Sequence, residues 1–126
     1  MRCLIVDDSP GFQAAARRLL EFEGITIAGV ASTSAEALLL AEELRPDVML
    51  IDLDLGGESG LELARRLHGQ TGLAPLKTIL VSTHDEQDYR DLIAESPAIG
   101  FLPKTKLSAY AIRELLATAA NGSRER

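Results

Sequence analysis

Four short apolar runs constrain the fold of this 126-residue chain more than any other feature. They are Leu4–Val6, Val48–Ile51, Ile79–Val81 and the mixed run Ile25–Ala31. Three of the four do not alternate between polar and apolar residues, which is typical of parallel strands buried on both faces. A fifth short strand is predicted at Ile99–Leu102.

Helix start signals lie between these runs. Ser9 precedes Pro10, and capping boxes begin at Thr33 and at Ser59. A weaker helix is predicted over residues 85–95, and a last one begins near Ser108. Alternating strands and helices predict a doubly wound α/β fold with five helices on both faces of a five-stranded parallel sheet. Right-handed crossovers favour the flavodoxin-like strand order 2-1-3-4-5.

Length and composition predict one soluble domain. We assign residues 1–120 to that domain and 121–126 to a polar tail or the start of a linker. A net charge of -6 argues against a nucleic-acid-binding surface. Cys3 is the only cysteine, which excludes an internal disulfide and suits a cytoplasmic protein. No apolar run approaches the roughly 18 residues of a membrane span.

Polar and charged residues follow the predicted strands where each strand ends. Asp7 and Asp8 follow the first, Asp52 ends the third, and Ser82 and Lys104 lie after the fourth and fifth. The carboxyl ends of parallel strands share one edge of the sheet, where ligands bind at the switch point of this fold. Two unit charges about 4 Å apart cost roughly 4 kcal/mol at an effective dielectric of 20, so the carboxylates need a cation.

A hard divalent cation such as Mg²⁺ would offset the charge of these carboxylates, because it takes oxygen ligands and retains water. Asp52 then has the chemistry of a nucleophile that forms an aspartyl phosphate. Lys104 and the metal would offset charge on the phosphoryl oxygens, and Ser82 would donate a hydrogen bond to one of them.

The sequence resembles a response-regulator receiver domain of two-component signalling over nearly the whole chain. The resemblance rests on Asp7 and Asp8, on Asp52 in MLIDLDL, on Ser82 in ILVST and on Lys104 in GFLPK. The stretches EALLLAEELRPDVMLIDLDL and SGLELARRL further resemble receivers of the NarL/FixJ type, which usually carry a helix-turn-helix output domain. A CheY-like fold and a role in transcription regulation are therefore expected.

The resemblance implies a role for each of these residues. Asp52 accepts a phosphoryl group from a histidine kinase or a phosphotransfer protein. Asp8, Asp52 and the backbone carbonyl of Asp54 ligate Mg²⁺, and Asp7 acts mainly through water. Lys104 pairs with the phosphoryl group. The protein is then not a turnover enzyme, although it catalyses its own phosphorylation and dephosphorylation.

The resemblance also implies how the signal leaves the site. Ser82 moves toward the phosphoryl group and Phe101 rotates inward, which alters the face of the fourth helix, fifth strand and fifth helix. Homodimerisation on phosphorylation is expected at this face. Asp54 and His84 occupy positions that tune the phosphoryl lifetime, and the bulkier Thr83 is expected to narrow access to Asp52.

The chain departs from the family pattern at three places. Gly56 stands where the family often has Pro, which predicts a more flexible loop in LGGESG. Thr105, instead of Pro, follows Lys104, and the bulkier Thr83 follows Ser82. These departures leave room for a pseudo-receiver, a binding module that ignores phosphate.

An enzyme is the third alternative. Asp52-Leu53-Asp54 resembles the Asp-x-Asp signature of haloacid-dehalogenase-type phosphatases. Those enzymes expect Thr or Val where Gly56 stands, and their motif lies on the first strand of the core.

Overall fold

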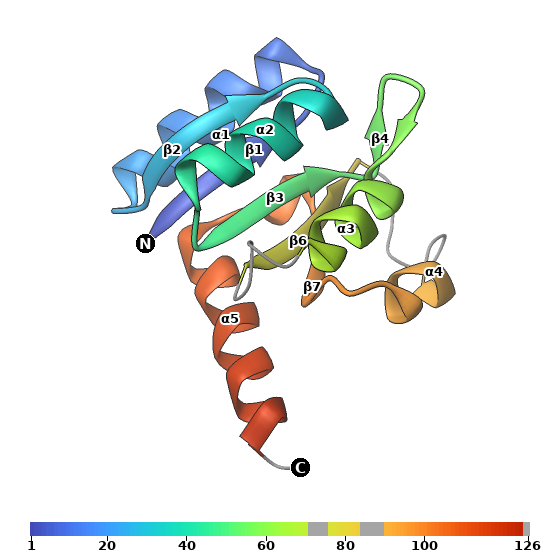
Figure 1. Cartoon of the computed structure of the whole chain (residues 1–126). Helices are drawn as coiled ribbons and strands as arrows, with labels where there is room; N and C mark the ends of the chain where they lie inside the picture. Colours follow the sequence, from blue (N-terminus) through green and yellow to red (C-terminus); the bar gives the residue numbers. More distant parts are fainter. Residues whose placement is uncertain (71–75, 84–89, 125–126) are drawn as a thin grey trace.

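The computed structural model describes residues 1–70, 76–83 and 90–124, in which five parallel strands form one sheet with helices on both faces (Figure 1). The spatial order is β2-β1-β3-β6-β7, and every neighbouring pair is parallel. Counted along this sheet, the order is the predicted 2-1-3-4-5, so the flavodoxin-like fold is confirmed. The strands are β1 (Arg2–Val6), β2 (Thr26–Ala31), β3 (Val48–Asp52), β6 (Lys77–Ser82) and β7 (Gly100–Pro103).

Burial explains the character of the apolar runs. The central strand β3 is buried at every residue, and β1 and β6 are buried at all but their first. A strand covered on both faces has no polar side to show, so its sequence does not alternate. Strand β2 lies at the sheet edge and is only partly buried, which accounts for the mixed composition of its run.

The helices are α1 (Pro10–Phe22), α2 (Ser34–Leu44), α3 (Gly60–Gly69), α4 (Arg90–Glu95) and α5 (Ala109–Arg124). Three of them, α1, α2 and α3, begin at the predicted caps. The hydroxyls of Ser9, Thr33 and Ser59 each accept a hydrogen bond from the backbone N–H three residues later. These bonds satisfy N–H groups that the first helical turn leaves without a partner.

Two apolar clusters hold the helices against opposite faces of the sheet. Leu4, Met49 and Leu80 pack with residues of α2, α3 and α4. Ile5 and Leu50 point the other way, toward α1 and α5. Successive residues of a strand point to opposite faces, so each buried strand supplies both clusters.

Helices α4 and α5 can be compared with their predicted bounds. The helix predicted over residues 85–95 is seen from Arg90, and residues 85–89 lie outside the described part of the chain. Helix α5 runs through Arg124, so its backbone includes residues 121–124 of the predicted tail. The division of the chain at residue 120 stays a prediction. Among the described residues, no helix combines the length and hydropathy needed to cross a bilayer.

Helix α3 is anchored against the end of β3 by a glycine. The N–H of Gly60 donates to the carbonyl of Leu53 at 3.0 Å. A Cβ atom on Gly60 would overlap the carbonyl oxygen of Asp52 and would lie 3.0 Å from the Cα of Leu53. Only a residue without a side chain lets the helix begin so close to the strand.

Gly60→Ala should therefore lower the free energy of unfolding by about 1–3 kcal/mol, because backbone must shift to admit the new methyl group. Urea denaturation followed by far-UV circular dichroism measures this. Gly69→Ala is the matched control at the other end of α3, where a Cβ would meet nothing within 4 Å. Equal stability of the two variants would contradict the packing argument.

Candidate functional site

The predicted site residues come from separate strand ends at the carboxyl edge of the sheet. Asp7 and Asp8 directly follow β1, and Asp52 is the last residue of β3. Ser82 is the last residue of β6, and Lys104 directly follows β7. The parallel arrangement thus brings together residues that lie up to a hundred positions apart in the sequence.

Three carboxylates form the centre of the site. Oxygens of Asp7, Asp8 and Asp52 all lie within 4.8 Å of one another. Asp7 is fully buried and Asp52 is 6% exposed, whereas Asp8 is exposed. The cluster therefore has two oxygen donors inside the protein and one at its surface.

Lys104 balances the two buried carboxylates. Its Nζ lies 2.6 Å from Oδ2 of Asp7 and 3.2 Å from Oδ2 of Asp52. The lysine side chain is itself only 13% exposed. Burial lowers the pKa of Lys104, but the contact with Asp7 and the charges of both carboxylates outweigh burial, so the pKa is raised and the ammonium stays charged.

The surroundings of Asp52 have opposing effects on the pKa of its carboxyl group. Its Oδ1 accepts a hydrogen bond from the backbone N–H of Asp54 at 3.2 Å, and its Oδ2 faces Lys104. Burial raises the pKa of the Asp52 carboxyl; the Asp54 N–H and Lys104 lower it, and the charge of Asp7 raises it. The net pKa is raised, because the favourable contacts do not fully replace the lost water.

The donor set fits a hard divalent cation. Carboxylate oxygens are the ligands that Mg²⁺ takes, usually one or two of them together with water. Oδ1 of Asp7 accepts the N–H of Ser9 at 2.8 Å, and its buried Oδ2 lies 2.6 Å from Nζ of Lys104. Oxygens of Asp7, Asp8 and Asp52 lie within 4.8 Å of one another, close enough for one cation, or a water bound to it, to contact all three.

The two predicted switch residues are both buried. Ser82 is 3% exposed and pairs in register with Pro103, the residue before Lys104. Phe101 is 8% exposed and belongs to the apolar cluster that contains Ile93 of α4. The structure shows one position of each side chain, so their movement stays a prediction.

The structure describes two of the three predicted modulators. The side chains of Asp54 and Thr83 are exposed, and the Asp54 carboxylate is not part of the three-carboxylate cluster. Its backbone carbonyl remains the predicted metal ligand. His84 lies outside the described residues.

Sequence reasoning missed two residues that shape the site. The ring of Phe12, in the first turn of α1, lies 4.3 Å from Nζ of Lys104, close enough for a cation–π contact. The side-chain amide of Gln13 donates to the backbone carbonyl of Asp7 and, at 3.0 Å, to Oγ of Ser32. No sequence pattern marks either role, because both depend on where α1 lies over the sheet.

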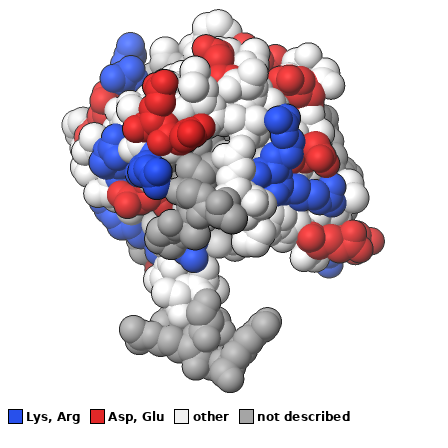
Figure 2. All heavy atoms as spheres, in the orientation of Figure 1, with Lys and Arg blue, Asp and Glu red and all other residues white. Residues whose placement is uncertain are grey.

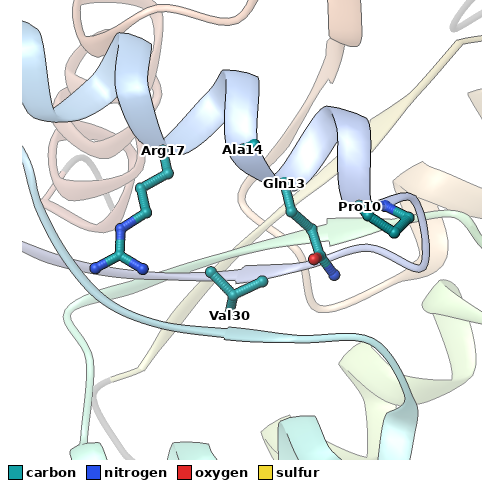
Figure 3. A pocket seen from close by; sticks show the side chains of 5 residues that line it. All are labelled: Pro10, Gln13, Ala14, Arg17 and Val30. Carbon is teal, nitrogen blue, oxygen red and sulfur yellow. The ribbon is translucent and has the colours of Figure 1, made fainter.

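The surface outside the three-carboxylate cluster has a pocket among the described residues and a mixed distribution of charge. A pocket of about 310 Å³ lies between α1 and β2, and none of the predicted site residues lines it (Figure 3). The pocket is lined by Pro10, Gln13, Ala14, Arg17 and Val30. Figure 2 shows acidic and basic groups interspersed over one face of the molecule.

Known proteins share this arrangement. The family model of the response regulator receiver domain matches residues 3–117. The chain therefore belongs to the family of response regulator receiver domains of two-component systems. Such domains act as phosphoacceptor switches rather than as turnover enzymes, bind Mg²⁺ through an acidic pocket, and interact with histidine kinases or phosphotransfer proteins.

Two curated relatives support the predicted NarL/FixJ type. Response regulator GacA of Pseudomonas aeruginosa is 30% identical over 105 residues, which cover 82% of this chain and 48% of GacA. Response regulator UvrY of Escherichia coli K12 is 33% identical over 102 residues, which cover 80% of this chain and 46% of UvrY. The chain spans about half the length of these relatives.

A solved structure supports the CheY-like fold. The CheY-like response regulator receiver domain protein from Methanospirillum hungatei JF-1 is 25% identical, with a TM-score of 0.76. The match covers 99% of this chain and 98% of that one.

The raised pKa of Asp52 predicts that its charge destabilises the fold. The folded protein binds the Asp52 proton more tightly than the unfolded chain does. The free energy of unfolding therefore falls as the pH rises from below the unfolded pKa of Asp52 through its folded pKa. Asp52→Asn should then be more stable than wild type at neutral pH. Its advantage should shrink toward about pH 4, where an ordinary aspartate begins to take up its proton.

Urea denaturation at neutral and acidic pH measures this difference. Asp47→Asn is the matched control, because Asp47 is exposed and lies just before the other end of β3. A variant of Asp52 that is less stable than wild type at neutral pH would refute the electrostatic interpretation.

Proposed function

We propose that this chain is a Mg²⁺-dependent phosphoaspartate switch in which Asp52 receives the phosphoryl group from a histidine kinase or phosphotransfer protein. The observation that supports this most is the Lys104 ammonium lying against Asp52 and Asp7, with Asp8 beside them. A nucleophilic carboxylate, a fixed cation and additional metal ligands are what phosphoryl transfer to an aspartate requires.

The transfer exchanges one bond to phosphorus for another. A carboxylate oxygen of Asp52 forms a new P–O bond while the P–N bond of the donor phosphohistidine breaks, and the electron pair returns to the imidazole. Lys104 is already 3.2 Å from the carboxylate, so its ammonium is placed to pair with the phosphoryl oxygens. Ser82 would donate its hydroxyl hydrogen to one of them.

The metal would be held by Asp8, by Asp52 and by the backbone carbonyl of Asp54, with Asp7 acting mainly through water. When bound, it would neutralise charge that develops on the phosphoryl group. The two buried carboxylates and the lysine leave the exposed Asp8 as the ligand that is easiest to reach from solvent.

The signal would leave the site along α4, β7 and α5. Phosphorylation adds about -1.5 to -2 charges and strong hydrogen-bond acceptors next to Ser82. A hydrogen bond that draws Ser82 inward would change the packing around Phe101, whose cluster includes Ile93 of α4. Asp54, Thr83 and His84 would set how long the phosphoryl group persists.

The wider setting follows from the relatives. GacA and UvrY are response regulators, and this chain matches about half of each. We infer that it serves transcription regulation in the cytoplasm, and that protein partners carry its signal.

Incubation with Mg²⁺ and acetyl phosphate, followed by intact mass measurement, tests the proposal. Wild type should gain one phosphoryl group and Asp52→Ala should gain none. Asp47→Asn, which removes an exposed charge just before β3 but keeps a side-chain oxygen to accept the N–H of Arg2, should be labelled like wild type. Labelling of Asp52→Ala would contradict the assignment, and an unlabelled wild type would favour the pseudo-receiver.

The signalling face predicts a change in association. Sedimentation velocity with Mg²⁺ and beryllofluoride should show dimers that are absent without beryllofluoride, because the altered α4–β7–α5 face then supports pairing. Identical sedimentation under both conditions would count against dimerisation.

A further inference from the structure

The loop after Asp52 is a paired hairpin, which the sequence analysis did not predict. Strands β4 (Asp54–Leu55) and β5 (Glu58–Ser59) are antiparallel, with Leu55 paired to Glu58. The turn between them is Gly56-Gly57, with φ of +58° and +97°. Two successive positive φ values are typical of the type I′ turn that suits a two-residue hairpin loop.

The turn lies against the exposed carboxylate of the site. A Cβ atom on Gly56 would lie 2.9 Å from Oδ2 of Asp8 and 3.7 Å from its Cγ. A Cβ atom on Gly57 would meet nothing within 4 Å. The backbone of the turn therefore requires glycine, or a residue tolerant of positive φ, at both positions. Only at Gly56 would an added side chain also collide with a neighbour, the Asp8 carboxylate.

The hairpin is tied to the fold on both sides. At its start, the N–H of Asp54 donates to Oδ1 of Asp52 at 3.2 Å. On its second strand, Oε1 of Glu58 accepts the N–H of Ser34, the first residue of α2, at 3.0 Å. A side chain added at Gly56 would press on an anchored turn and on the free end of Asp8, and the carboxylate is the part that yields more easily.

We propose that Gly56 is a positioning residue for the metal: its missing side chain gives the Asp8 carboxylate the room to face Asp7 and Asp52. This inference rests on the proposed function, because it assigns Asp8 as a metal ligand. A methyl group at Gly56 would turn Asp8 away from the other two carboxylates. Asp52 and Lys104 would be unaffected, since the three heavy atoms nearest to the added methyl group all belong to Asp8.

Titration with Mg²⁺ followed by ¹H–¹⁵N NMR tests this, because the shifts of the Asp8 and Asp52 amides report the site directly. Gly56→Ala should bind Mg²⁺ about 10-fold more weakly than wild type, the scale seen when a group that orients a metal ligand is lost. Gly57→Ala is the matched control. It places the same methyl group at positive φ in the same turn but in open space, so it should bind as wild type does.

Folding is separated from binding by urea denaturation of each variant without metal. If Gly56→Ala does not fold, Gly56→Asn replaces it, because asparagine tolerates positive φ and Asn-Gly is a favoured type I′ pair. It carries the same Cβ atom and should show the same loss of affinity.

The outcomes separate this inference from the proposed function. Wild-type Mg²⁺ affinity in a folded Gly56 variant would overturn the positioning role alone. An equal loss in Gly57→Ala would also overturn it, since turn strain would then be the cause. A wild-type protein that shows no Mg²⁺-dependent shifts at Asp8 and Asp52 would overturn the proposed metal site and this inference with it.

Discussion

The contact of Lys104 with Asp7 and Asp52 is the interaction on which the rest of the site depends. Two buried carboxylates in one cluster are unfavourable, and the ammonium 2.6 Å and 3.2 Å from them supplies the opposing charge. The compensation is incomplete, because the pKa of Asp52 remains raised. Burial is the largest cause of that shift, and the proposed divalent cation would add positive charge beside the two buried carboxylates.

The fold can hold these carboxylates close together because its central strands are buried on both faces. Apolar clusters above and below the sheet hold β1 and β3 firmly, so their ends cannot separate to relieve the repulsion between carboxylates. Gly60 brings α3 against the backbone of Asp52, and the turn of the hairpin after Asp52 lies beside the exposed Asp8 carboxylate. The packing of the apolar core thus holds the carboxylates together although their charges repel one another.

The hairpin also shows how a departure from a family pattern acquires a structural meaning. Glycine at residue 56 suggested a more flexible loop, yet the segment is paired and anchored to α2 through Glu58. A Gly-Gly pair flanked by short extended segments is a recognised hairpin signal, so this feature was within reach of the sequence. The contact with Asp8 was not, because it depends on how two loops from different strands approach each other.

The sequence by itself determined the strand positions, the helix starts at Ser9, Thr33 and Ser59, and the set of polar residues at the strand ends, because burial and capping act through local pattern. Only the tertiary structure decided which oxygens face which cation. The positions of Phe12 beside Lys104, of Gln13 beneath Asp7 and of Gly56 beside Asp8 arise from helix packing and loop approach across the sheet. Such contacts join residues far apart in the chain, and no local preference encodes their distances.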